Sequence, residues 1–346
     1  MDDLATLEVE GSPADIRGFW GLLLMSSATR SLGWLCEEYL RFKVLAPESC
    51  KRYRLSATNL ARQMHGAKAD PTSVPLQSIT ADVLIAFRDD CRRRMRPASV
   101  NTERRHLSTM LNFACRQGCL ERNPYREVPS IPTPQTEPKA LAKKEMFQFL
   151  EFLESGRRLD SRGRSVDVIP PQWFWLAVLR TFYFTGMRKR QLLGLHWNDI
   201  SLTEETILLR SDTSKTRREW RVPLPPALAP DLMNLMRETQ RIVGNDLDGR
   251  QVFCLPLFSA WSGAFVSREM RAHNLDGFFR RLRKHLPASM PRISAHRIRH
   301  TTATILANAV PNLKVVQQQL GHTSISTTYG YVHPDLNAMR DALGAL

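Results

Sequence analysis

The chain has 346 residues, which is more than one ordinary domain and suits two. Hydrophobic residues make up 42% of it, so the chain can build packed cores and wholesale disorder is excluded. Lysine and arginine number 49 against 34 aspartate and glutamate, and the formal net charge of +15 favours a polyanionic partner, most often nucleic acid. The alternative is a generic basic surface without such a partner.

Four amphipathic patterns in the first third predict a bundle of helices. Ser31 can cap the first helix, the third starts near Thr80, and the fourth runs from Ser99 to a stop at Gly118. Apolar residues recur at helical spacing in each pattern: Leu32, Leu35, Cys36, Tyr39 and Leu40, then Tyr53, Ala57, Leu60, Ala61 and Met64, then Val83, Phe87 and Cys91, then Leu107, Met110, Leu111, Ala114 and Cys115. Four helices that pack on one another are the expected solution.

Three basic runs lie on these predicted helices, and any one of them alone could be only a solvated face. Together, in a strongly basic chain, they indicate contacts with DNA phosphates. The expected DNA-binding residues are Lys51, Arg52, Arg54, Arg104 and Arg105, and the third run is Arg92, Arg93, Arg94 and Arg96.

A proline-rich stretch separates two domains. Pro124, Pro129, Pro132, Pro134 and Pro138 remove amide donors and block helix continuation, which predicts a stiff connector. The expected organisation is an N-terminal extension over 1–28, a helical DNA-binding domain over 29–128, a linker over 129–138 and a catalytic domain with a C-terminal tail over 139–346.

The cysteines and the N-terminus predict a reducing, cytoplasmic location. Most of the six cysteines fall at apolar helical positions, and no second pair at zinc-ligand spacing accompanies Cys115 and Cys119. No basic region precedes an apolar run at the N-terminus, and the apolar stretch 19–25 is too short to span a bilayer. We therefore expect neither a structural metal nor a membrane segment.

The second domain reads as helices around two short strands. A long apolar helix over about 173–184 ends at Thr185-Gly186, and Leu192, Leu193, Leu195 and Trp197 suggest a further buried helix. Residues 206–209 and 221–224 read as strands, joined by a polar turn over 211–218 with Lys215 near its tip. The polar stretch 155–167 has no apolar period and predicts a mobile loop.

Two more helices are expected near the C-terminus. Ser294 can cap one that carries His296, Arg299 and His300 at its start, and another ends at Gly321 and leaves His322 just beyond it. Thr323 or Ser324 then caps a short segment that presents Tyr329 and Tyr331.

The cationic residues of this domain suit one chemistry. Two arginines, a lysine, two histidines and a tyrosine, with no acidic partner among them, can hold a phosphodiester while a phenolate attacks it: Arg188, Lys215, His296, Arg299, His322 and Tyr331. The pair His296 and His300 at i and i+4 also resembles a zinc helix. The general-base glutamate of such helices is missing and Arg299 would repel a cation, so the metal interpretation is weak.

Five motifs in order resemble the tyrosine recombinases, the family of phage integrases and of the Xer and Cre resolving enzymes. The motifs are Thr185-Gly186-Met187-Arg188, the hairpin Lys215, His296-x-x-Arg299-His300, Leu320-Gly321-His322, and Tyr331 followed by His333. The resemblance implies a mainly α fold with a small antiparallel β-sheet. An N-terminal SAM-like helical core-binding domain, ending at Asn123-Pro124, and a C-terminal mixed α/β catalytic domain would form a clamp on DNA.

The resemblance also implies a role for each site residue. Arg188 and Arg299 would bind the non-bridging oxygens of the scissile phosphate, for which planar guanidinium groups are suited. Lys215 would protonate the departing 5′ oxygen, and Tyr331 would be the nucleophile that forms a 3′-phosphotyrosyl link. The ordinary tyrosine pKa of about 10 requires that the surrounding cations favour the phenolate or that a base assists.

His296 stands where the family places a histidine or lysine that assists proton transfer, and His322 where a histidine or tryptophan donates a hydrogen bond to the phosphate. The family's pattern after Gly321-His322 implies that Tyr331, rather than Tyr329, is the nucleophile. Gln191 departs from the family, which usually has an acidic residue there to support the arginine region.

The family implies that no metal or nucleotide cofactor is needed. It also implies double-stranded DNA as the partner, a dimer on each site and a homotetramer on two sites, association with the nucleoid, and accessory DNA-bending proteins in some systems. Apolar residues at helical spacing in the tail could dock on a neighbouring protomer or on their own domain: Leu336, Met339, Leu343 and Leu346.

Two rival functions stay open from the sequence. A type IB topoisomerase shares the chemistry but relaxes one duplex, and a non-catalytic DNA-binding regulator would need only the basic bundle. The Leu320-Gly321-His322 motif and the complete catalytic set favour a recombinase: an integrase of a mobile element, a transposon recombinase or a resolvase.

Overall fold

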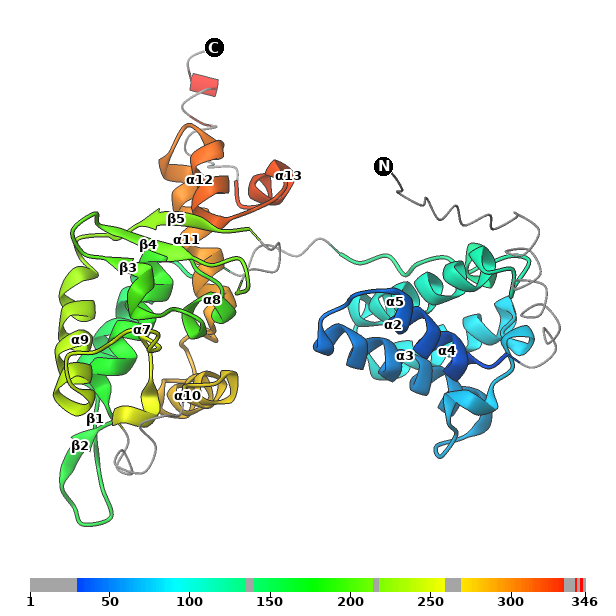
Figure 1. The fold of residues 1–346 in the computed structure, drawn as a ribbon, viewed down its shortest axis with the longest axis horizontal. Helices are drawn as coiled ribbons and strands as arrows, with labels where there is room; N and C mark the ends of the chain where they lie inside the picture. Colours follow the sequence, from blue (N-terminus) through cyan, green and yellow to red (C-terminus); the bar gives the residue numbers. More distant parts are fainter. Residues whose placement is uncertain are drawn as a thin grey trace, which may run out of the picture. The chain divides into compact units, whose positions relative to one another are not determined.

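A computed structural model describes residues 30–134, 140–213, 218–258 and 269–332, with the isolated positions 340, 343 and 344. The chain divides into two compact units, residues 1–136 and 137–346, and each has its own apolar core. Figure 1 shows the two units.

Four helices build the first unit, as the apolar patterns predict. They are α2 (Leu32–Phe42), α3 (Pro47–His65), α4 (Ala81–Arg94) and α5 (Pro97–Arg116). The Ser31 hydroxyl caps α2 by accepting from the Trp34 N–H at 3.2 Å, and Thr80 caps α4 in the same way. The helices α3 and α5 begin earlier than their apolar patterns indicate because a proline occupies the first turn of each.

The first core is made by the predicted stripes, with Leu35, Leu60, Phe87 and Leu107 almost completely buried. Short 3₁₀ turns at Pro71–Ser73, Leu76–Ser78 and Pro124–Arg126 complete the unit.

The second unit surrounds a small antiparallel sheet with helices. The sheet has the order β3 (Ile200–Ser201), β4 (Thr206–Leu209), β5 (Trp220–Pro223), and Ile207 is in register with Val222. The helices are α6 (Lys143–Ser155), α7 (Gln172–Thr185), α8 (Lys189–Leu193), α9 (Ala229–Val243), α10 (Ala272–His285), α11 (Ala295–Ala309), α12 (Leu313–Leu320) and α13 (Ile325–Tyr329).

The apolar helix α7 is the centre of this unit. It packs against α6, α9 and α11, and the Trp175 ring stacks on Phe278 of α10 with 4.1 Å between ring centroids. Since α7 is apolar on nearly every side, it must be covered from several directions. The helices α12 and α13 lie at one end of the unit, the upper end in Figure 1, and both contact α11.

The prediction of a loop over 155–167 is wrong. The segment forms a hairpin of β1 (Arg157–Leu159) and β2 (Ser165–Asp167), at the end of the unit away from α13 (Figure 1). One carboxylate oxygen of Asp160 accepts from the backbone N–H groups of Arg162 and Arg164, at 2.8 and 2.9 Å, and Gly163 takes a φ of +72°. These local hydrogen bonds close a tight turn in a segment whose sequence has no apolar periodicity.

The prediction of a further helix through Leu195 and Trp197 is correct only for the residues of α8. Gly194 follows its last residue, and Trp197–Asp199 forms a separate 3₁₀ turn. The elements α6, α9, α10 and β3 have no counterpart in the predicted set. None of the described helices has both the length and the apolar character that crossing a membrane requires.

Candidate active site

Helix α11 presents His296, Arg299 and His300 on one side. The Ser294 hydroxyl accepts from the Arg297 N–H at 3.2 Å and fixes the start of the helix. The spacing i, i+3, i+4 places the three cationic positions on one face near the helix N-terminus.

The Arg299 guanidinium is buried and held at three points. One terminal nitrogen donates to the Gly186 carbonyl at 2.6 Å, and the other donates to the Leu320 carbonyl at 2.8 Å and to His322 Nε2 at 3.1 Å. The side chain is 4% exposed. It therefore connects the C-terminal ends of α7 and α12 to α11, and its position is fixed before any substrate binds.

Burial is the main cause that lowers the pKa of Arg299. The charge of Arg188 acts in the same direction, and Tyr331 opposes both. The guanidinium nevertheless remains protonated at neutral pH because its ordinary pKa is so high. The site thus holds a desolvated positive charge close to the predicted nucleophile.

Two left-handed glycines permit this arrangement. Gly186 ends α7 with φ +65° and Gly321 ends α12 with φ +62°. A Cβ on Gly186 would lie 2.9 Å from a Leu320 methyl carbon, and one on Gly321 would lie 2.2 Å from the Trp220 ring. Only glycine meets both the conformational and the steric demand at these two turns.

His322 is held as a neutral imidazole in one tautomer. Burial, followed by the charges of Arg299, Arg188 and His300, lowers its pKa to about 4. A guanidinium can only donate, so Nε2 of His322 accepts the hydrogen bond from Arg299. The imidazole proton is then on Nδ1, which donates to the Thr328 hydroxyl at 3.0 Å.

Tyr331 lies against His322 and His300, whereas Tyr329 is exposed. The Tyr331 ring is 8% exposed, parallel to the His322 ring at 5.7 Å between centroids, and 5.1 Å from the centroid of His300. Tyr329 is 60% exposed. The geometry supports the prediction that Tyr331 is the nucleophile.

Arg188 lies close enough to this group for its charge to act on Tyr331, Arg299, His296 and His322. Burial lowers the pKa of Arg188, and Tyr331 opposes the shift. One terminal nitrogen of the Arg188 guanidinium is buried and has no hydrogen-bond partner among the described residues. A buried donor of this kind suits an anionic ligand such as a phosphate oxygen.

Gln191, the departure from the family pattern, supports Arg188 through the backbone. Its carbonyl oxygen accepts from the Arg188 N–H at 2.7 Å, which caps the short helix α8. Gln191 is 1% exposed, and within the described part of the chain its amide nitrogen has no partner.

His296 is hydrogen-bonded to a histidine that the set of predicted site residues omits. Nε2 of His296 and Nε2 of His300 lie 2.9 Å apart, so one donates and the other accepts. Burial lowers the pKa of His296, and Arg299 and Arg188 add to the effect. The position of His300 one helical turn after His296 is the sequence signal that could have identified it.

Several predicted features fall outside the described residues. They are Lys215, His333 and most of the C-terminal tail, including Leu336, Met339 and Leu346. The proposed general acid and the proposed docking of the tail therefore remain predictions.

The structure separates the predicted DNA-binding residues by their contacts. Lys51 pairs with Glu48 at 2.8 Å, and Arg54 pairs with both oxygens of Glu37. Arg104 donates to the carbonyls of Tyr125 and Val128, and it also packs over the Tyr125 ring. Its guanidinium holds the chain that follows α5 in place.

Arg52 and Arg105 are exposed and form no ion pair within the described residues. Both charges act on His106, so Arg52 of α3 and Arg105 of α5 each lie near that residue. These two remain the most available phosphate contacts of the predicted set.

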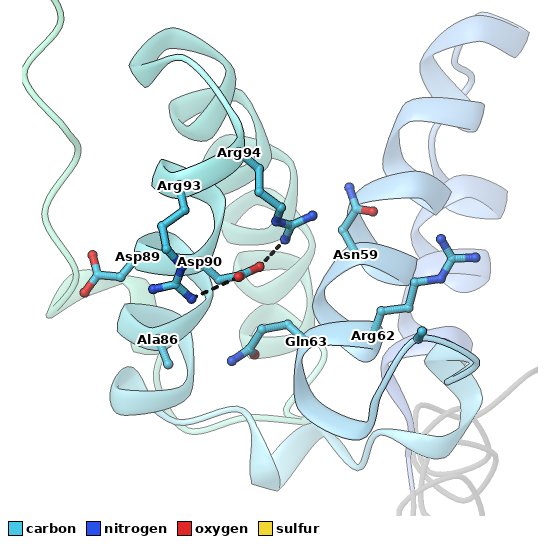
Figure 2. Close-up of a pocket in the computed structure, with 9 residues that line it drawn as sticks. Asn59, Arg62, Gln63, Ala86, Asp89, Asp90, Arg93 and Arg94 are labelled. Atoms are coloured by element: carbon cyan, nitrogen blue, oxygen red, sulfur yellow. Dashed lines mark hydrogen bonds and ion pairs between the residues drawn. The ribbon is translucent and has the colours of Figure 1, made fainter.

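The third basic run borders a hollow of about 680 Å³ between α3 and α4 (Figure 2). Arg93 and Arg94 both contact the carboxylate of Asp90, which lies between them, and Arg92 lies 3.7 Å from Asp89. The two aspartates offset only part of the charge of these four arginines, and Asp89 also pairs with Arg88 at 3.0 Å, so the run keeps a net positive charge.

The sequence is similar to those of known proteins. The model of the phage integrase family matches residues 139–337. A putative tyrosine recombinase XerC of Pseudomonas syringae is 30% identical over 316 residues, covering 89% of this chain and 63% of the relative. A protein of the same name from Pseudomonas aeruginosa is 29% identical, with 90% and 70% covered. The chain thus spans somewhat less than two thirds of the first relative.

Solved structures show the same fold at low sequence identity. The integrase of transposon Tn1549 in complex with transposon right end DNA has a TM-score of 0.66 and 19% identity, covering 92% of this chain and 99% of that one. A lambda integrase tetramer bound to a Holliday junction has a TM-score of 0.65 and 18% identity, with 92% and 84% covered. The family model spans more than half of the sequence, and the chain belongs to the phage integrase family.

Proposed function

We propose that this protein is a site-specific DNA recombinase that cuts and rejoins strands through a 3′-phosphotyrosyl intermediate on Tyr331. The observation that carries the proposal is the enclosure of the Tyr331 ring by His322 and His300, within the field of Arg188 and Arg299. Two desolvated guanidinium groups and a buried phenol, with no carboxylate among them, suit attack on a phosphodiester.

In the proposed cleavage step, the Tyr331 oxygen bonds to phosphorus while the bond from phosphorus to the 5′ oxygen breaks. Arg188 and Arg299 bind the non-bridging oxygens, where negative charge accumulates in the transition state. Lys215 protonates the 5′ oxygen as it leaves, and the phenolic proton leaves Tyr331 with help from the surrounding cations or a base.

In the rejoining step, the 5′ hydroxyl of another strand attacks the phosphotyrosyl phosphorus and Tyr331 departs. The number of phosphodiester bonds is unchanged, so no nucleotide has to supply energy. The proposed chemistry uses only side chains and requires no metal ion.

We further propose that the enzyme acts as a dimer on each site and as a tetramer on two sites. Lambda integrase, which shares the fold, is described as a dimer on a core site and as a tetramer on a Holliday junction. The helical unit would hold the duplex through Arg52 and Arg105, with accessory DNA-bending proteins in some reactions. Because the named relatives are bacterial, we expect the protein to act on DNA in the bacterial cytoplasm.

The test uses nicked suicide duplexes drawn from the DNA that flanks the gene, because the release of a short strand after cleavage traps the covalent product. We expect a protein–DNA adduct that survives denaturation for the unmodified chain and for Tyr329→Phe, and none for Tyr331→Phe. An adduct with Tyr331→Phe would contradict the proposal. Site-independent relaxation of supercoiled DNA would favour a topoisomerase, and binding without cleavage by the unmodified chain would favour a regulator.

A further inference from the structure

Thr328 connects two parts of the candidate site although it contributes no charge. It lies in α13 and is fully buried. Its hydroxyl contacts His322 Nδ1 at 3.0 Å, and its backbone carbonyl accepts from the Tyr331 N–H at 3.0 Å. One residue therefore contacts both the imidazole of His322 and the backbone of the proposed nucleophile.

The tautomer described for His322 is not the one that binding of a phosphate requires. In the structure the Nε2 lone pair accepts from Arg299, so this nitrogen has no proton to donate. The role proposed for His322 is donation to a phosphate oxygen. The proton must then be on Nε2, and the hydrogen bond from Arg299 must be released.

A hydroxyl can support both states of the imidazole. The Thr328 oxygen accepts when Nδ1 carries the proton, and the same hydroxyl donates when Nδ1 presents its lone pair. A carboxylate at this position could only accept, and it would favour the imidazolium. An aliphatic side chain could do neither and would leave a buried polar atom unpaired.

We infer that Thr328 is a positioning residue that lets His322 exchange between two neutral tautomers when the scissile phosphate enters. The inference rests on the proposed function. Arg299 moves its hydrogen bond from Nε2 to the phosphate, Nδ1 releases a proton to solvent, and Nε2 takes up one proton from solvent. No net charge is added to the buried site, and rotation of the Thr328 hydroxyl restores its hydrogen bond to Nδ1.

Three variants separate this role from packing. Thr328→Val keeps the shape and removes the hydroxyl, Thr328→Ser restores the hydroxyl, and Thr327→Val makes the same change at the exposed neighbour on α13. We expect Thr328→Val to slow single-turnover adduct formation on the nicked duplex at least about tenfold, equivalent to about 1.4 kcal/mol. Thr328→Ser and Thr327→Val should stay within about threefold of the unmodified chain, a difference of roughly 0.7 kcal/mol.

A spectroscopic measurement tests the tautomer itself. The ring-nitrogen resonances of ¹⁵N-histidine-labelled full-length protein distinguish protonated from unprotonated Nδ1 and Nε2, and His322→Gln assigns the signals of His322. We expect the proton on Nδ1 in the free protein and on Nε2 when the nicked duplex is bound to Tyr331→Phe. In Thr328→Val, the free protein should keep the proton on Nδ1, because Arg299 still donates to Nε2, whereas the shift of the proton to Nε2 on DNA binding should be lost.

The outcomes distinguish the inference from the proposed function. If the unmodified chain forms no adduct, the proposed function fails. If it forms an adduct while Thr328→Val reacts at the same rate, or while His322 keeps one tautomer with and without DNA, the inference about Thr328 is wrong. A loss of activity in Thr328→Ser equal to that in Thr328→Val would also overturn it, because the hydroxyl would then not be the cause.

Discussion

The imidazole of His322 lies almost parallel to the phenol ring of Tyr331, with 5.7 Å between ring centroids and an interplanar angle of 11°. The same imidazole accepts a hydrogen bond from Arg299. The proposed nucleophile and the proposed phosphate-binding arginine are therefore connected through one neutral ring, and a change at that ring affects both.

Replacing Gly321 by alanine should disrupt this connection. The new Cβ would lie 2.2 Å from the Trp220 ring, in addition to the cost of φ +62° for a residue with a side chain. That conformation alone costs roughly 1–2 kcal/mol. Gly249→Ala is the matched control, because Gly249 has the same φ of +62° and no atom within 4 Å of the added Cβ.

Chemical denaturation should show a clearly larger loss of unfolding free energy for Gly321→Ala than for Gly249→Ala. Adduct formation should fall only in Gly321→Ala, because the displaced chain carries His322. Equal losses of stability would contradict the close packing of α12 against Trp220.

The stability of the second unit should depend on pH through His322. Its pKa is lowered from the ordinary 6.5 to about 4 in the folded protein. The unfolded chain therefore binds more protons between these values, and stability is full above pH 6.5 and falls as the pH drops toward 4. The difference corresponds to roughly 3 kcal/mol.

His322→Gln should remove this part of the pH dependence, measured as unfolding free energy at several pH values between 4 and 7. His273→Gln, at an exposed position of α10, is the control and should leave the dependence unchanged. An unchanged slope in His322→Gln would mean that His322 is not held neutral by burial.

His296 and His300 should behave as one unit. Each provides one end of a single hydrogen bond of 2.9 Å, so loss of either removes the same interaction. We expect His296→Gln and His300→Gln each to slow adduct formation by roughly tenfold or more. The double variant should be only slightly slower than the worse single variant, because effects within one pair are not additive. Multiplicative effects in a double-mutant cycle would show that the two histidines act independently.

Replacing each of two adjacent arginines on α5 should have a different effect, one on DNA binding and the other on stability. Arg105 is exposed without an ion pair in the described residues, whereas Arg104 donates to the carbonyls of Tyr125 and Val128. Arg105→Ala should weaken DNA binding and lower the salt slope of log K by about 1, with little change in stability. Arg104→Ala should destabilise the helical unit, an effect visible in thermal unfolding. The reverse assignment of the two effects would contradict the proposed DNA-binding face.

Much of the fold follows from local patterns in the sequence. The helices α2, α4, α7, α11 and α12 show apolar stripes, capping side chains or terminal glycines, all of which act within a few residues. The β1–β2 hairpin was missed because its turn depends on the bonds of Asp160 to its own loop rather than on apolar periodicity.

The site residues could be identified from motifs, but their contacts could not. The sequence predicts neither the tautomer of His322 nor which group donates in its hydrogen bond with Thr328. Both depend on Arg299, which comes from another helix and sets the tautomer. Likewise, the basic run in the sequence does not show that Arg104 stabilises the fold whereas Arg105 is exposed to solvent. Those distinctions depend on tertiary packing.

The most direct test of the proposed mechanism is to identify the tyrosine that becomes linked to DNA. The adduct formed on a nicked suicide duplex is digested with nuclease and trypsin, and the peptide over residues 315–340 is sequenced by fragmentation mass spectrometry. That peptide contains both Tyr329 and Tyr331, so the fragments between them locate the nucleotide remnant. The account predicts the remnant on Tyr331; a remnant on Tyr329, or a covalent link to any other residue, would contradict it.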